Sequence, residues 1–124
     1  MQPVIGPALF TAECGSTADK TAVCFSLHRF GRDWLLSIGG GETHLGALSC
    51  SDKKRNTIKS LCLDIHKEES ITRKVLAELS PLVEGELLVI AGIHYDNINR
   101  QQIETILHNC DQLIDRTRTF LKSL

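Results

Sequence analysis

Four side chains in this sequence could together bind a phosphate or a metal ion, and each lies near an end of an expected strand. They are His44, His66, His94 and Asp96. A histidine ring can donate hydrogen bonds to phosphate or carbonyl oxygens, and it is the commonest nitrogen ligand of divalent metals. No two of these histidines have the i, i+4 spacing of a helical zinc motif. A common site therefore depends on whether the fold brings the three histidines together.

Glycines flank two of these histidines in the sequence. Backbone N–H groups at glycine can approach a phosphate closely. The usual phosphate-loop ending, a Lys followed by Ser or Thr at the start of a helix, is missing. The glycines therefore allow two interpretations, a phosphate cradle or a simple hairpin connection. They are Gly39, Gly40 and Gly41 before His44, Gly46 after it, and Gly92 before His94.

A second candidate anion site is the start of the last helix. Asp96, Asn97 and Asn99 follow the apolar run 87–91, and Asn99 with Gln102 has the spacing of a capping box. Free N–H groups and the helix dipole favour negative charge there, although ordinary capping explains the same residues. Lys67 could also meet an anionic ligand, or it could belong with Glu68 and Glu69 to a solvated turn and helix start.

The elements that must position these groups follow from the hydrophobic patterning. Alternating apolar residues predict strands, and apolar residues at helical spacing predict two helices. We expect an α+β fold with a mostly antiparallel sheet of about six strands, in the order five-strand meander, helix, buried strand and long C-terminal helix. Both helices should lie on one face, and residues 1–124 should form a single domain. The expected strands are 8–14, 21–29, 34–38, 44–50, 57–65 and 87–91, and the helices are 70–82 and one from about 99 to the C-terminus.

This order of elements predicts one shared end of the sheet. The glycine loop joins the third and fourth strands, and the antiparallel fifth strand returns to the same end at His66. A helical crossover then sets the sixth strand parallel to the fifth, so it also ends there, at His94. His28 and His108 should lie away from this end and serve as internal controls.

The two faces of the expected sheet differ in side-chain size. The face with large apolar side chains can receive both helices. The other face can be solvated, covered by a second copy of the chain, or used by a flat ligand. The first face carries Val23, Phe25, Leu27, Trp34, Leu36, Ile38, Leu61 and Leu63, and the second carries Cys24, Ser26, Ser37, Gly46, Ser60 and Cys62.

Composition narrows the class of protein. The 124 residues are 42% hydrophobic with a net charge of −1, which gives no support to a nucleic-acid partner or an anionic membrane surface. No apolar run is long enough to span a bilayer, and the N-terminus lacks a signal-peptide pattern. The 5 cysteines form no Cys-x-x-Cys pair, which favours reduced thiols and a cytoplasmic location.

Three segments resemble the LpdD-like family, which comprises small prenylated-flavin chaperones associated with gallate-type decarboxylases. The resemblance runs from about Trp34 to Leu113. It implies binding of reduced prenylated flavin mononucleotide (FMN), delivery to a UbiD-type decarboxylase, no reaction of the protein's own, and a homodimer. The matching segments are 39–48, 66–69 and 92–98.

The resemblance also implies roles for the candidate residues. The flavin phosphate would lie near the loops at the shared end of the sheet and the helix start at Asn97, where the glycines permit close approach. His44, His66 and His94 would contact the phosphate or a bridging divalent metal ion. No catalytic residue is assigned, because no nucleophile is evident.

Two other functions fit the same residues. The first is a small metal-dependent enzyme, a hydrolase or lyase, that uses the three histidines as ligands. The second is a non-catalytic structural subunit of a decarboxylase complex. The lack of an evident nucleophile favours binding over catalysis.

Overall fold

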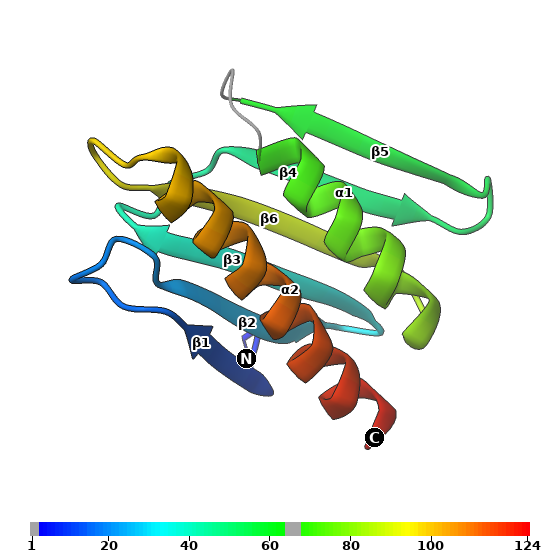
Figure 1. Cartoon of the computed structure of the whole chain (residues 1–124). Helices are drawn as coiled ribbons and strands as arrows, with labels where there is room; N and C mark the ends of the chain where they lie inside the picture. The colour runs from blue at the N-terminus through cyan, green and yellow to red at the C-terminus, as the bar shows by residue number, and fades with distance from the viewer. Residues whose placement is uncertain (1–2, 64–67) are drawn as a thin grey trace.

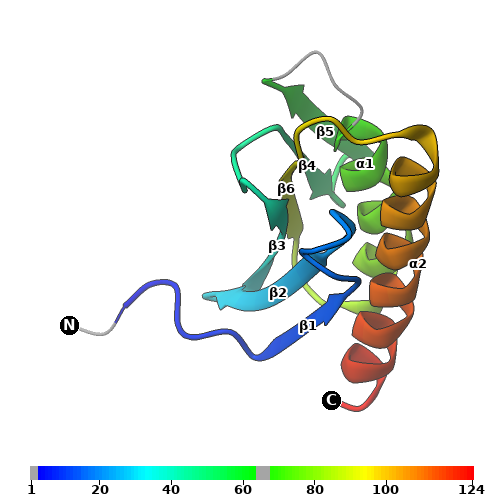
Figure 2. The ribbon, with the colours of Figure 1, turned by 60° about the vertical axis from the view of Figure 1, so that its left-hand side comes forward.

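The computed structural model describes residues 3–63 and 68–124, which form a six-stranded sheet with two helices on one face (Figure 1, Figure 2). The fold class is therefore the expected α+β class. The helices are α1 (Glu68–Leu79), which continues into a 3-10 turn, η1 (Ser80–Leu82), and α2 (Arg100–Lys122). The strands are β1 (Phe10–Cys14), β2 (Val23–Phe30), β3 (Asp33–Gly41), β4 (Ala47–Asp52), β5 (Thr57–Cys62) and β6 (Leu87–His94).

The strand order in the sheet is β1-β2-β3-β6-β4-β5. The direct pairing of β3 with β4 that a five-strand meander implies is absent, because β6 lies between them. Strand β6 pairs parallel with β3 and antiparallel with β4. This central position suits the aliphatic run Leu87–Ala91, because a strand paired along both edges keeps its backbone groups satisfied in an apolar environment.

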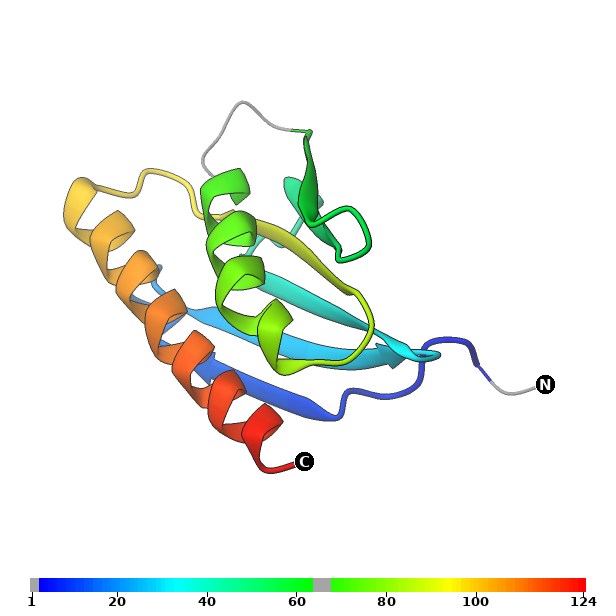
Figure 3. The same ribbon diagram turned by 90° about the vertical axis from the view of Figure 1, so that its right-hand side faces the viewer.

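The helices cover the sheet as two neighbours (Figure 1, Figure 3). Helix α1 packs on β6 and β4, and helix α2 packs on β1 and β2. The core between the layers contains the apolar residues expected from β2 and β3, with Val75 and Leu79 from α1 and Leu113 and Ile114 from α2. The buried members from the two strands are Val23, Phe25, Leu27, Trp34, Leu36 and Ile38.

Strand β5 faces the opposite way from the sequence prediction. Leu61 and Leu63, predicted to face the helices, are 52% and 55% exposed. Ser60, predicted for the other face, lies under α1: the Ser49 hydroxyl is 2.8 Å from the hydroxyls of both Ser60 and Thr72. These three hydroxyl groups form a chain of hydrogen bonds with one another, so the small polar residues can occupy the buried side of the sheet.

The face without helices presents one continuous row of side chains across the sheet. Within the described residues no helix covers this face (Figure 2). The row changes from polar to aliphatic along its length, and we call it the open-face row. In register it runs Ser26, Ser37, Ile90, Leu48 and Leu61.

Candidate functional site

The parallel pairing of β3 with β6 brings two of the predicted histidines together. Gly41 and His94 are paired in register at the ends of these strands, and the loop 42–46 follows directly. The rings of His44 and His94 meet edge to face, with 6.2 Å between their centroids. We call this end of the sheet the rim. The third predicted histidine, His66, and the neighbouring Lys67 lie outside the described residues.

The two histidines have different hydrogen-bonding surroundings. The His94 Nε2 atom lies 2.9 Å from the Asp96 carboxylate, and both side chains are largely exposed. The His44 Nδ1 atom lies 3.3 Å from the backbone carbonyl of Glu42. Each ring is therefore oriented by an oxygen acceptor, which favours a proton on the nitrogen facing that acceptor.

The predicted glycines allow the loop 42–46 to pack against β6. A Cβ atom on Gly92 would overlap the carbonyl group of His44, and one on Gly41, whose φ is +64°, would overlap the carbonyl of His94. A Cβ atom on Gly46 would lie 3.3 Å from His44 Nε2. The N–H of Gly40 donates to the Thr43 hydroxyl at 3.1 Å. These contacts explain the glycines structurally, and a role in binding phosphate stays a prediction.

The helix start at Asn99 is capped as the sequence indicates. The Asn99 side chain accepts from the Gln102 N–H at 2.8 Å, and the Gln102 side chain accepts from the Asn99 N–H at 2.8 Å. Asn97 adopts a left-handed conformation with a φ of 56°, which turns the chain between β6 and α2. Capping is thus confirmed, and anion contacts by Asp96 and Asn97 stay predictions.

The loop between β1 and β2 also reaches the rim, which sequence reasoning missed. The Lys20 ammonium group donates to the Asp96 carbonyl at 2.8 Å, and the Tyr95 hydroxyl donates to the Ala22 carbonyl at 2.6 Å. This loop therefore places a positive charge beside His94 and Asp96. No local pattern could have indicated it, because Lys20 and Asp96 are 76 positions apart.

A cavity of about 460 Å³ opens beside the rim on the helix side, and we call it the helix-side cavity. It lies where the first turns of α1 and α2 face the end of β6. Most of its lining is aliphatic, and the last residue of β6, His94, and the next residue, Tyr95, also line it. The lining residues are Glu68, Ser70, Ile71, Ile93, His94, Tyr95, Ile98, Ile103, Ile106 and Leu107.

Glu68 is the unexpected member of this lining. The sequence suggested a solvated turn and helix start, and Glu68 does begin α1, but its side chain is only 7% exposed. Its Oε2 atom has no hydrogen-bond partner within the described residues. A Cβ atom on Gly46 would lie 3.2 Å from the Glu68 carboxyl carbon, so this carboxyl group lies close to the loop that carries His44.

A second cavity of about 460 Å³ lies on the open face, on the other side of the same rim. His44 and Leu45 border it from the loop 42–46, and Ile90 lies on its floor. His44 therefore adjoins the open-face cavity and His94 adjoins the helix-side cavity. The edge-to-face contact between their rings therefore lies where the two cavities approach the rim.

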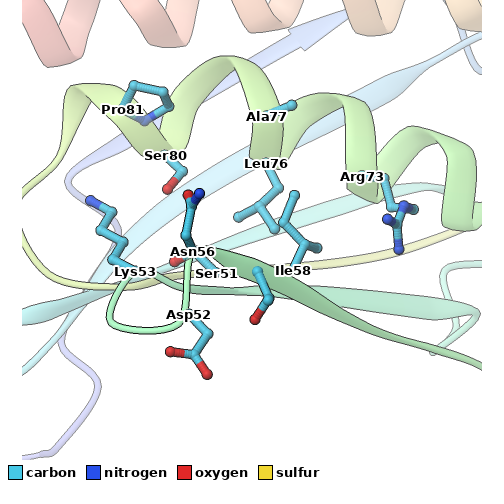
Figure 4. A pocket seen from close by; sticks show the side chains of 11 residues that line it. Ser51, Asp52, Lys53, Asn56, Ile58, Arg73, Leu76, Ala77, Ser80 and Pro81 are labelled. Atoms are coloured by element: carbon cyan, nitrogen blue, oxygen red, sulfur yellow. The ribbon is translucent and has the colours of Figure 1, made fainter.

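A third cavity, of about 360 Å³, lies away from the rim between the β4–β5 hairpin and α1 (Figure 4). Its charged groups are already engaged. Lys53 Nζ donates to the Val83 carbonyl at 2.6 Å, and Arg73 donates to the Ser60 hydroxyl at 3.0 Å. Hydrogen bonds from Arg55 hold the pKa of the Asp52 carboxyl below its ordinary value. These contacts tie the hairpin to the helix, and the rim is the better candidate site.

The structure gives no support to the metal site predicted from three histidines. Among residues 3–63 and 68–124, no group of three His, Cys, Asp or Glu side chains is arranged to hold a metal ion. Over the same residues, no helix is long and apolar enough to cross a membrane.

The fold is similar to that of a solved chaperone. The similar chain belongs to the crystal structure of a novel chaperone complex for yeast 20S proteasome assembly. The TM-score is 0.55 at 10% sequence identity, with 96% of this chain and 99% of that chain covered. At this identity the likeness shows the fold alone. No curated protein sequence is similar enough to this chain to count as a match.

The family follows from a second comparison. Residues 17–122 match the sequence profile of the prenylated flavin chaperone LpdD-like domain. The chain therefore belongs to this family, which confirms the resemblance drawn from the loops around His44, His66 and His94.

Proposed function

We propose that this chain binds reduced prenylated FMN and passes it to a UbiD-type decarboxylase, as a cytoplasmic chaperone without a reaction of its own. The observation that carries the proposal is the meeting of His44 and His94 beside a mainly apolar cavity, in a chain of the prenylated flavin chaperone family. The bound flavin would supply its redox-active ring system, and the chain would bind, orient and shield it.

The helix-side cavity suits a flat, largely apolar ring system. Its volume of about 460 Å³ is within the usual range of small-molecule sites. Ile71, Ile93 and Ile106 supply aliphatic walls, and Tyr95 supplies an aromatic side chain. The buried Glu68 carboxylate, whose Oε2 atom has no partner within the described residues, offers a polar acceptor in this wall. These features fit a ligand that combines a large apolar surface with a few polar edge groups.

The rim suits the phosphate group of the same ligand. The Lys20 ammonium can present an N–H donor to phosphate oxygens, and the rings of His94 and His44 can do so when both of their nitrogens carry a proton. Gly41, Gly46 and Gly92 would support this site by keeping the loop 42–46 close to β6, and Gly40 would support it through its hydrogen bond to Thr43 in that loop. Asp96 would orient His94, and Asn97, His66 and Lys67 are further proposed contacts.

We also propose that a second copy of the chain covers the open face. Leu45, Leu61 and Leu63 are each more than half exposed on that side of the molecule. Burial of such side chains against an identical surface is the usual way for a homodimer to form. A homodimer is also what the family resemblance implies.

Cofactor retention tests the binding proposal. The chain is co-expressed with a flavin prenyltransferase and purified without oxygen, and the retained prenylated FMN is measured by absorbance and mass spectrometry. We expect His94→Ala, His44→Ala and His66→Ala to lose most of the cofactor. Equal retention by these variants and the controls would count against the site.

His28→Ala and His108→Ala are the matched controls. His28 contacts the Gly6 carbonyl at 3.0 Å, and the His108 ring lies 3.2 Å from the Gln112 side chain, so neither takes part in the rim contacts described above. A separate assay tests delivery: loaded chain is mixed with a cofactor-free UbiD-type decarboxylase, and recovery of decarboxylation is followed. Recovery no faster than with an equal amount of unbound cofactor would contradict the delivery role.

A further inference from the structure

Glu68 is a buried carboxylate, and one of its two oxygen atoms has no hydrogen-bond partner within the described residues. It is only 7% exposed, and its Oε2 atom accepts no hydrogen bond from the described residues. Burial of a charged oxygen without a donor destabilises the folded protein. Because Glu68 itself lies in the lining of the helix-side cavity, a bound ligand could supply a donor to its carboxyl group.

The described cations on α1, Arg73 and Lys74, each pair with a carboxylate other than Glu68. Lys74 pairs with Asp111 at 2.5 Å, and Arg73 pairs with Glu69 at 3.8 Å. One helical turn beyond Glu68, the hydroxyl of Thr72 donates to the Glu69 carbonyl at 3.1 Å. The Lys20 ammonium at the rim donates to the Asp96 carbonyl. None of these groups donates to Glu68.

The surroundings of Glu68 define what kind of donor would fit. The cavity wall is formed by Ile71, Ile93, Tyr95 and Ile106, which favours a flat apolar ligand. Such a ligand can reach the carboxylate only with a donor in the plane of its ring, because its faces are apolar. An N–H group at a ring edge has this geometry, and a carboxylate is its strongest acceptor.

We propose that Glu68 determines the specificity of the helix-side cavity by accepting a hydrogen bond from a ring N–H of a flat heteroaromatic ligand. In a flavin this donor is the N3–H of the pyrimidine ring, which lies between two carbonyl groups. The inference deepens the proposed function and rests on it, because it assigns one edge of the flavin ring to Glu68.

A ring-only ligand tests this assignment without the phosphate. Lumiflavin, which carries the N3–H, and N3-methyl-lumiflavin, which lacks it, are titrated into the full chain by fluorescence. We expect the wild-type chain to bind lumiflavin about tenfold more tightly than its N3-methyl form. The preference should shrink in Glu68→Gln and vanish in Glu68→Met, while Glu69→Gln, which changes the neighbouring and more exposed carboxylate, should keep it.

Thermal unfolding without ligand provides a second readout. Glu68→Met should unfold at the same or a higher temperature than the wild type, since it removes an uncompensated buried charge at similar volume. Lumiflavin should raise the unfolding temperature of the wild type more than that of Glu68→Met.

Three results would overturn the inference. They are equal binding of both flavins by the wild type, a preference that persists in Glu68→Met and is therefore steric, and binding of neither flavin. The proposed function is judged separately by retention of reduced prenylated FMN. A chain that retains this cofactor but shows no N3–H preference would refute the role of Glu68 alone.

Discussion

The carbonyl group of His44 packs against the backbone of Gly92, in the space that a Cβ atom would fill. The loop 42–46 crosses the end of β6 at this point, and the Gly46 N–H donates to the Ala91 carbonyl at 2.9 Å. The position of the His44 ring therefore depends on the absence of a side chain at residue 92. This one contact therefore requires glycine at residue 92 and also places His44, a candidate ligand-binding residue.

Gly92→Ala should destabilise the protein by about 2–4 kcal/mol, because the added methyl group meets backbone atoms that cannot rotate away. Urea unfolding measures the change. Gly6→Ala is the control, since a Cβ atom at Gly6 would meet nothing within 4 Å. A loss at Gly92 no larger than at Gly6 would show that the loop 42–46 is not packed as described.

The hydroxyl chain under α1 gives a second prediction. Thr72→Val should destabilise the protein by about 1–2 kcal/mol, because Ser49 loses one of its two hydrogen-bonded neighbours within the core. The double variant with Ser49→Ala should lose less than the sum of the two single changes. Strict additivity in chemical unfolding would contradict the coupling between Ser49 and Thr72.

Burial of Cys110 predicts a dependence of stability on alkaline pH. Desolvation raises the pKa of the Cys110 thiol from 9.0 to about 12. Above pH 9 the unfolded chain loses this proton while the folded chain keeps it, so stability falls as the pH rises towards 12. Between pH 8 and pH 10 the thiol should lower the free energy of unfolding by about 1.4 kcal/mol. Cys110→Ala should lack this component, and an unchanged pH dependence would contradict it.

The open face provides the test of the homodimer. We expect the wild-type chain to sediment as a dimer, and Leu61→Lys to weaken dimerisation at least tenfold by placing a charge in the buried surface. Leu124→Lys changes another exposed leucine, at the C-terminus and outside the sheet, and should leave the dimer intact. A wild type that is monomeric at high concentration would refute the homodimer. A dimer insensitive to Leu61→Lys would place the interface elsewhere.

Local signals in the sequence predicted the local structure well. The alternation in residues 21–29 and 34–38 identified the strands and their buried side, because one side of each carries nearly all of the large apolar residues. The capping box at Asn99 was also predictable, since it involves only residues 99 and 102. The placement of His44 and His94 at one end of the sheet followed from strand direction alone.

The errors arose where the outcome depends on distant partners. Alternation of apolar residues shows that a segment is a strand, but it does not always show which of its two sides faces the core. In β5 both sides carry an aliphatic residue, Ile58 on one and Leu61 on the other. The insertion of β6 between β3 and β4 depends on pairing between segments far apart in the sequence. Burial of Glu68 depends on α1 packing beside Gly46, which no pattern around residue 68 indicates.

The insertion of β6 also sets an order of events during synthesis. Strands β1 to β3 and the β4–β5 hairpin can each form from nearby residues, but they join only through β6, which is made after α1. A nascent chain that has not yet reached Leu87 carries unsatisfied backbone edges on β3 and β4, which are prone to pair with other chains. His44 and His94 become neighbours only once residue 94 has left the ribosome. A ligand that needs both histidines can therefore bind only after β6 has completed the sheet.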